Sequence, residues 1–233
     1  MGKKVLVVDD EKLIVKGIRF SLEQDGMEVD CAYDGEEALE AAKKKDYDVV
    51  LLDIMLPKLT GFEVCQQIRE FSSMPIIMLT AKGDDMDKIL GLEYGADDYI
   101  TKPFRPLEVV ARVKAQLRRY KKYNSVQAGT TEESIIVHSG LVLNSSTHEC
   151  ILNEKPLDLT PTEFYILRIL LERKGKVVSA EELFREIWKD EYYTKSNNTI
   201  TVHIRHLREK MGDTVENPQY IKTIWGVGYK IEL

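Results

Sequence analysis

The sequence predicts two domains: an α/β domain with a doubly wound, five-stranded parallel sheet, then an α+β domain in which three helices precede a β-hairpin. In the first half, strand and helix signals alternate strictly, which is the pattern of a doubly wound sheet. The strands at 5–8 and 49–52 are apolar throughout, as expected where helices cover both faces. In the second half, three helix-start signals come before two strands joined by a turn that contains glycine.

The alternation in the first half defines the elements of a first domain, residues 1–120. We expect its strands at 5–8, 28–32, 49–53, 75–79 and 98–101. Apolar residues with helical period, or an alanine-rich composition, predict helices near 13–22, 36–45, 62–69, 84–94 and 107–120. Residues 121–134 lack this periodicity and are polar and turn-prone, so we interpret them as a linker.

The second domain, residues 135–233, has a different rhythm. Short strand signals lie at 135–137, 141–144 and 150–152. Capping boxes that begin at Thr160 and Ser179 start two helices, and Ser196 or Asn197 can cap a third that runs to about Met211. Two further strands, at 220–224 and 228–231, form the closing hairpin.

Composition and charge exclude several classes of protein. No stretch approaches the roughly 20 apolar residues that span a bilayer, and the first residues lack the apolar core of a signal peptide. We therefore expect a cytoplasmic protein without membrane insertion, with its three cysteines reduced. The net charge is −6 and neither half is basic, so nucleic-acid binding must rest on a local patch.

Carboxylates end two of the apolar strands. Asp9 and Asp10 follow the first strand, and Asp53 ends the third. Open α/β sheets place their sites at the carboxyl ends of such strands. Crowded carboxylates repel one another unless a cation lies among them, and oxygen-only ligands favour a hard ion. The sequence therefore predicts a Mg²⁺ site at this edge of the sheet.

Four groups of residues at or after strand ends carry a family resemblance. Over residues 1–120 the chain resembles the receiver domain of bacterial two-component systems, through Asp9-Asp10, Asp53 with Pro57 and Gly61, Thr80-Ala81 and Lys102-Pro103. The resemblance implies that Asp53 accepts a phosphoryl group from a sensor histidine kinase. It also implies an absence of enzyme activity, apart from slow removal of the chain's own phosphate.

The resemblance assigns further roles around Asp53. Asp10, Asp53 and the backbone carbonyl of Met55 would ligate Mg²⁺, with Asp9 acting through water. Lys102 would neutralise the phosphoryl oxygens, next to a cis Lys102-Pro103 peptide. Thr80 would donate a hydrogen bond to the phosphate, and Tyr99 would rotate inward as Thr80 moves.

Residues 95–104 and the last helix of this domain are similar to the OmpR/PhoB branch of the family. In that branch these segments belong to a face that forms a two-fold dimer on phosphorylation. The charges on such a face must be self-complementary. By position, the expected pairs are Lys88 with Glu108, Asp98 with Arg112, and Asp97 with Arg118 or Arg119. A solvated charged face is the alternative reading.

The third helix of the second domain has an apolar stripe and a polar face. The polar face suits a major groove, because it offers side chains that can contact bases or phosphates: Asn198, Thr201, Val202, Arg205, His206 and Arg208. A solvated amphipathic helix is the alternative. The order of three helices and a hairpin resembles the winged-helix output domain of the OmpR/PhoB group. That resemblance implies phosphate contacts from the hairpin, by Lys222, Thr223 and Lys230.

The same helix also carries two histidines, and the hairpin carries a tryptophan. His203 and His206 are three residues apart, but no third metal ligand is near in sequence, so we expect His203 to be structural. Trp225 stands where many family members have an arginine that reaches the minor groove, which leaves that contact open.

The resemblance as a whole implies a phosphorylation-controlled transcriptional regulator. We expect it to activate promoters as a dimer together with RNA polymerase. Residues 95–123 and 196–230 are most similar to regulators of glycopeptide-resistance genes. A phosphohydrolase is an alternative, although such enzymes commonly carry a second acid where this chain has Met55. A second alternative is a DNA-binding protein whose receiver domain is inactive.

Overall fold

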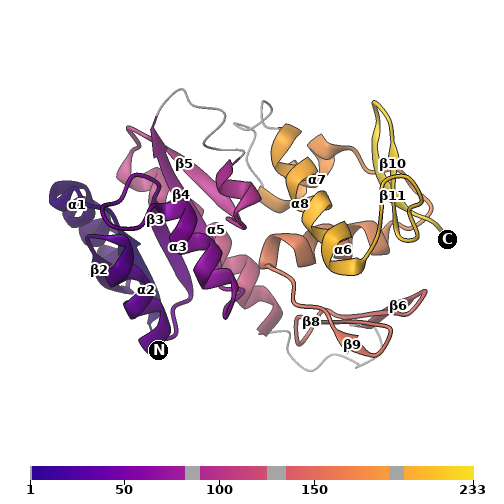
Figure 1. Ribbon diagram of the computed structural model, residues 1–233, viewed down its shortest axis with the longest axis horizontal. Coiled ribbons are helices and arrows are strands. Elements are labelled where there is room, and N and C mark those ends of the chain that lie inside the picture. The colour runs from indigo at the N-terminus through magenta and orange to yellow at the C-terminus, as the bar shows by residue number, and fades with distance from the viewer. Residues whose placement is uncertain (1, 82–89, 125–134, 189–196) are drawn as a thin grey trace. The chain divides into compact units, whose positions relative to one another are not determined.

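The computed structural model describes residues 2–81, 90–124, 135–188 and 197–233, with only the backbone of 118–124 and 197–198. The chain divides into two compact units, Met1–Tyr120 and Lys121–Leu233. Figure 1 shows the elements of each unit. In the part of the chain that is described, no helix is both long enough and apolar enough to cross a membrane.

The first unit has the expected five-stranded parallel sheet. All neighbouring strands are parallel, which confirms the predicted fold class. The strand order is β2-β1-β3-β4-β5. The bounds of the strands are β1 Lys3–Val8, β2 Met27–Ala32, β3 Val49–Asp53, β4 Ile76–Ala81 and β5 Asp98–Lys102.

Helices follow the strands as the alternation predicts. They are α1 Lys12–Gln24, α2 Gly35–Lys44, α3 Gly61–Arg69 and α5 Pro106–Asn124. Most of the helix expected at 84–94 lies outside the described residues, although residues 90–93 are helical.

The last helix of the first unit is longer than expected. α5 continues to Asn124, so the first four residues of the expected linker, 121–124, are helical. The lysines and tyrosine in this last turn continue a helix at little cost, because a helix that has already formed needs no new nucleus. Residues 125–134 of the expected linker lie outside the described residues.

The register of the sheet brings the ends of four strands to one edge. Asp53 pairs with Leu79, so Thr80 lies one residue beyond it on the neighbouring strand. Lys102 pairs with Ala81 at the end of β5. Because parallel strands share one direction, the acids that follow β1 and end β3 lie at the same edge as these residues. The core beneath is fully buried and includes Val7, Leu51, Ile77, Leu79 and Ile100.

Gly61 allows the chain after β3 to turn back onto that strand. Its N–H donates to the carbonyl of Ile54 at 2.9 Å. A Cβ atom at this position would lie 2.1 Å from the carbonyl oxygen of Asp53, which no side chain can occupy. Thr60 and Glu63 then close a capping box that starts α3. Glycine is therefore required for α3 to begin this close to Asp53.

The second unit begins with a four-stranded antiparallel sheet and ends with a two-stranded one. The strands of the first sheet are β6 Ile135–His138, β7 Leu141–Asn144, β8 Glu149–Leu152 and β9 Lys155–Pro156. The sequence did not predict β9, because two residues carry no periodicity. Three helices and the predicted hairpin follow: α6 Pro161–Glu172, α7 Ala180–Trp188, α8 Asn197–Met211, β10 Ile221–Ile224 and β11 Gly228–Ile231.

The three helices of the second unit enclose one core. α8 packs against both α6 and α7. The centre of this core includes the fully buried Phe164, Leu167, Leu183, Ile200 and Leu207. The hairpin is joined to it where Val178 and Tyr229 exchange backbone hydrogen bonds.

Candidate functional site

The acids at the edge of the sheet surround one lysine. Lys102 Nζ lies 2.7 Å from Oδ2 of Asp9 and 3.0 Å from Oδ2 of Asp53. Glu11 is at 3.8 Å, on the exposed side. The residues Asp9 and Asp53 are 0% and 5% exposed. Three elements distant in sequence therefore hold a half-buried ammonium group between two buried carboxylates.

Burial and neighbouring charge shift the pKa values of Asp53 and Lys102 in opposite directions. Burial raises the pKa of Asp53 to about 6, against the contact with Lys102, which lowers it. Burial alone would lower the pKa of Lys102, but its hydrogen bonds to Asp9 and Asp53 outweigh that effect and the pKa is raised. Lys102 is therefore a permanent cation near neutral pH, next to a carboxylate that needs positive charge to stay ionised.

Three carboxylates can offer oxygen atoms to a cation. Oxygens of Asp9, Asp10 and Asp53 all lie within 4.8 Å of one another. Asp10 is exposed, and the N–H of Glu11 donates to Oδ1 of Asp9 at 2.9 Å. This all-oxygen set fits a hard divalent cation such as Mg²⁺. Met55, whose backbone carbonyl was expected to complete this set, is 73% exposed.

The remaining residues of the predicted pocket lie on β4 and β5. Thr80 is 1% exposed, and its hydroxyl donates a long hydrogen bond of 3.4 Å to the carbonyl of Ala81. Tyr99 is already buried, at 7% exposure. The Lys102-Pro103 peptide is cis, which confirms that expectation.

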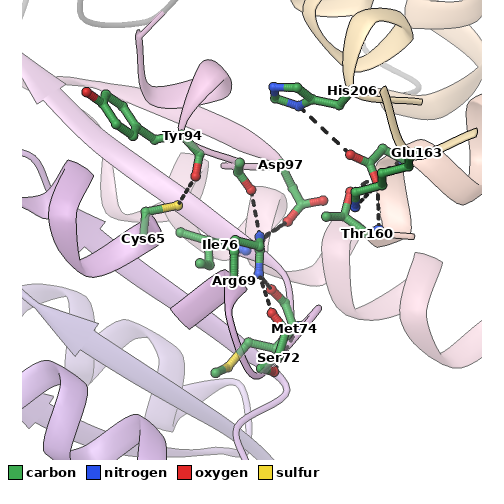
Figure 2. A network of polar contacts seen from close by, with 12 residues as sticks. Cys65, Arg69, Ser72, Met74, Ile76, Tyr94, Asp97, Thr160, Glu163 and His206 are labelled. Atoms are coloured by element: carbon green, nitrogen blue, oxygen red, sulfur yellow. Dashed lines mark hydrogen bonds and ion pairs between the residues drawn. The ribbon is translucent and has the colours of Figure 1, made fainter. Parts of the chain in front are cut away.

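The structure contradicts the expectation that Asp97 lies on a dimer face. Asp97 is completely buried. Its Oδ2 accepts hydrogen bonds from Arg69 Nη2 at 2.8 Å and from the N–H of Ile76 at 3.0 Å, as Figure 2 shows. The same guanidinium also donates to the carbonyls of Ser72, Met74 and Gly95. A carboxylate held this way is structural, because a buried charge needs a fixed partner such as this half-buried arginine.

Other residues of the predicted dimer face bind within one chain. Arg112 Nη1 lies 3.1 Å from Oδ2 of Asp98, and Arg112 Nη2 lies 3.5 Å from Glu108. Arg112 and Asp98 are both buried. Lys88 and the side chains of Arg118 and Arg119 lie outside the described residues.

A narrow strip of α8 is open to solvent. Thr201, Arg205 and Glu209 are exposed and four residues apart, so they lie in one row along the helix. Thr201 Oγ1 is 3.2 Å from the hydroxyl of Tyr229, and Arg205 Nε is 3.5 Å from Glu209. His206 is half-buried beside this row, and the side chain of Asn198 is not described.

Two residues assigned to the polar face of α8 lie inside the fold instead. Val202 and Arg208 are 6% and 7% exposed, which contradicts their expected outward position. Arg208 Nη2 donates to the carbonyl of Ile221 at 2.7 Å and to Thr223 Oγ1 at 2.8 Å. The helical wheel assumed one covered face, but α8 is covered by α6, α7 and the hairpin. Arg208 therefore joins α8 to β10.

The hairpin presents charge on its strands and apolar side chains at its tip. Lys222 and Lys230 pair across the hairpin and both bind Glu232, at 3.2 and 2.8 Å. Trp225 and Val227 at the turn are 81% and 57% exposed. Thr223 is already engaged by Arg208, so the two lysines are the better candidates for phosphate contacts.

Comparison with known families identifies both units. Residues 5–114 match the family described as "Response regulator receiver domain", and residues 154–231 match "Transcriptional regulatory protein, C terminal". The chain is a response regulator of the OmpR/PhoB type. The match to a response regulator explains why a lysine and three acids meet at the end of a parallel sheet.

Named relatives cover this response regulator from end to end. It is 62% identical over 232 residues to "Regulatory protein VanR" of Enterococcus faecium, with 100% of both chains covered. It is 46% identical over 239 residues to "Alkaline phosphatase synthesis transcriptional regulatory protein PhoP" of Bacillus subtilis (strain 168), covering 100% of this chain and 98% of that protein. The crystal structure of DrrB, an OmpR/PhoB homolog of Thermotoga maritima, covers 100% of both chains at 35% identity with a TM-score of 0.51.

Proposed function

We propose that Asp53 accepts a phosphoryl group from a sensor histidine kinase, and that its phosphorylation controls binding of the second unit to promoter DNA in the cytoplasm. The observation that carries this proposal is the contact of Lys102 with both Asp9 and Asp53. In the proposed step an oxygen of Asp53 forms the bond to phosphorus while the bond to the histidine nitrogen of the kinase breaks.

The residues around Asp53 have different roles in this proposed phosphoryl transfer. Phosphoryl transfer depends mostly on positioning and on neutralising charge. Lys102 supplies a fixed cation for the phosphoryl oxygens. Asp53 pairs with Leu79 on the neighbouring strand, and Thr80, the next residue on that strand, offers its hydroxyl group. Asp10, Asp53 and the carbonyl of Met55 would hold Mg²⁺, with Asp9 acting through water. The ion would supply further positive charge for the phosphoryl group.

Intact-mass measurement tests the phosphoacceptor directly. The full chain is incubated with lithium acetyl phosphate and Mg²⁺, next to the variant Asp53→Asn and the control Asp48→Asn. We expect the wild type and the control to gain one phosphoryl group, and Asp53→Asn to gain none. Phosphorylation of Asp53→Asn to the same extent would reject Asp53 as the acceptor. Slow loss of the added mass without any partner would show the proposed self-dephosphorylation.

We also propose that phosphorylation produces a two-fold dimer through the face that contains Asp98, Glu108 and Arg112. Because Asp98 and Arg112 already bind each other within one chain, pairing would require this contact to be exchanged or shared with the partner. Lys88, Arg118 and Arg119 remain candidates for the same face. Sedimentation with and without beryllofluoride tests the proposal, and an unchanged mass would contradict it.

The proposed output is activation of transcription through repeated DNA sites and contact with RNA polymerase. Thr201 and Arg205 on α8 would contact the major groove, with Lys222 and Lys230 on flanking phosphates. The 62% identity to VanR supports control of glycopeptide-resistance genes as the biological role. Chromatin mapping in the native host tests it; sites confined to unrelated genes would contradict it.

The two alternatives receive less support. The phosphohydrolase reading lacks the second acid, because an exposed Met55 occupies that position. A constitutive DNA-binding protein would have no need of the buried contacts among Asp9, Asp53 and Lys102. The acetyl phosphate experiment distinguishes this last alternative from the proposed function, since an inactive receiver would gain no phosphate.

A further inference from the structure

One carboxylate and two imidazoles meet in the second unit, beside the exposed strip of α8. Glu163 on α6 and His203 and His206 on α8 each place one ligand atom within 4.8 Å of the others. The spacing of the histidines suggested at most a pair, because the third side chain comes from another helix. Glu163 and His203 are 2% and 1% exposed, so the group lies inside the fold.

The carboxylate of Glu163 is fixed through one of its oxygens. Oε2 accepts hydrogen bonds from the N–H of Thr160 at 2.8 Å and from Lys210 Nζ at 2.7 Å. Oε1 faces His206, with Nδ1 at 3.9 Å, and Figure 2 shows Thr160 and His206 approaching Glu163. The capping box of α6 therefore holds Oε2, while Oε1 is directed at the imidazole.

The separation of Oε1 and Nδ1 suits an ion between them. At 3.9 Å it exceeds the length of a direct hydrogen bond. Zn²⁺ binds histidine nitrogen and carboxylate oxygen at about 2.0–2.2 Å, so two of its tetrahedral ligands lie about 3.4 Å apart. A shift of about half an ångström, within the freedom of the His206 side chain, would bring both atoms to bonding distance.

The chemistry of the three side chains also suits this ion. Imidazole nitrogen with one carboxylate oxygen is a usual zinc set, in which a water molecule takes the fourth position. The ammonium group of Lys210 bonds the carboxylate oxygen that the ion would not use. The side chain of His206 is 12% exposed, which gives solvent a route to the site.

We propose that Glu163, His203 and His206 bind one Zn²⁺ ion, through Oε1 of the glutamate and one nitrogen of each ring. The ion would join α8 to the first turn of α6. Because Thr201 and Arg205 lie on the same helix α8, bound zinc would also fix the strip proposed to contact DNA. This site is independent of phosphorylation at Asp53, so its failure would leave that proposal intact.

Zinc binding by the full chain tests the proposal. The protein is first stripped with a chelator and then titrated with Zn²⁺ in millimolar Mg²⁺, which occupies the acidic pocket of the first unit. Bound zinc is measured by competition with a chromophoric chelator. The variants are His206→Gln, Asp53→Asn and the control His138→Gln, each checked for folding by circular dichroism. Titration with Co²⁺ adds a visible spectrum that reports tetrahedral coordination.

The proposal predicts one zinc ion per chain in the wild type, in His138→Gln and in Asp53→Asn. His206→Gln should bind more than about 100-fold more weakly, because loss of an outer-shell partner alone costs about 10- to 100-fold. It should also lack the tetrahedral Co²⁺ spectrum. Absence of binding at micromolar zinc, or equal affinity in folded His206→Gln, would overturn the proposal. Loss of binding in Asp53→Asn alone would assign the zinc to the acidic pocket and overturn it as well.

Discussion

Lys102 Nζ lies 3.0 Å from Oδ2 of Asp53, a contact between the last residues of β5 and β3. The same ammonium group binds Asp9 at 2.7 Å. Burial favours the neutral form of Asp53, and the lysine favours the ionised form. The proposed nucleophile is therefore kept reactive near neutral pH by a cation that the sheet holds in place.

Removal of this cation should slow phosphorylation. In Lys102→Met, Asp53 would lose the contact that lowers its pKa, and the phosphoryl group would lose a positive partner. We expect the rate of phosphorylation by acetyl phosphate to fall by roughly 100-fold, the usual effect of deleting one charge-stabilising group. Intact-mass time courses measure it, with the exposed Lys114→Met as control. Equal rates in both variants would show that Lys102 has no part in the step.

The pair of Arg69 with the fully buried Asp97 should stabilise the first unit. In Arg69→Met the carboxylate of Asp97 keeps its backbone donor at Ile76 but loses its charge partner. Breaking a buried pair from one side costs about 3–5 kcal/mol. Urea unfolding followed by circular dichroism measures this loss, with the exposed Arg105→Met as control. A loss below about 1 kcal/mol, typical of a surface pair, would contradict the structural role of Asp97.

Arg205 and Arg208 on α8 should have opposite effects. Arg205→Ala is expected to weaken DNA binding by about 1–3 kcal/mol and to leave the stability nearly unchanged, because the side chain is exposed. Arg208→Met should lower the free energy of unfolding by about 1.5–3 kcal/mol, since hydrogen bonds from a charged group are lost. Anisotropy with a bound promoter fragment and urea unfolding measure the two effects. If Arg208→Met instead weakened DNA binding and left the stability unchanged, Arg208 would belong to the DNA-facing surface.

His148 should make the second unit sensitive to acid. Burial, with a smaller contribution from Arg168, lowers the pKa of His148 to about 4, and its ring packs edge-on against Phe164 at 4.4 Å. Between about pH 6.5 and 4 the unfolded chain binds this proton and the folded chain does not, so stability falls as the pH falls through this range.

In His148→Gln this acid sensitivity should shrink. We expect the loss of stability between pH 7 and 4.5 to decrease by about 1 kcal/mol, less than the full shift implies because the ring is partly exposed. Urea unfolding at both pH values measures it, with His138→Gln as the comparison. An unchanged pH dependence in His148→Gln would mean that the ring titrates normally in the folded protein.

The pocket could be predicted from sequence because its signals are local. Asp9 and Asp53 end apolar strands, and strands of one sheet must deliver their ends to one edge. Lys102 follows the last strand in the same way. The residue types and their order along the chain were therefore enough to bring them together.

Asp97, Val202 and Arg208 were misplaced because their burial depends on distant partners. Asp97 is enclosed by Arg69, and Arg208 reaches the carbonyl of Ile221 across the unit. A charged residue next to other charged residues in sequence carries no sign of such a partner. The helical wheel likewise counts one covered side, although α8 contacts helices and a hairpin on several sides.

The coupling between Asp53 and DNA is the central claim, and one binding measurement tests it most directly. The affinity of the full chain for a promoter fragment recovered by chromatin mapping is measured before and after acetyl phosphate treatment in Mg²⁺, for wild type and Asp53→Asn. We predict that phosphorylation tightens binding by about 5- to 150-fold in the wild type and has no effect on Asp53→Asn. Equal affinity of the phosphorylated and unphosphorylated wild type would contradict the account.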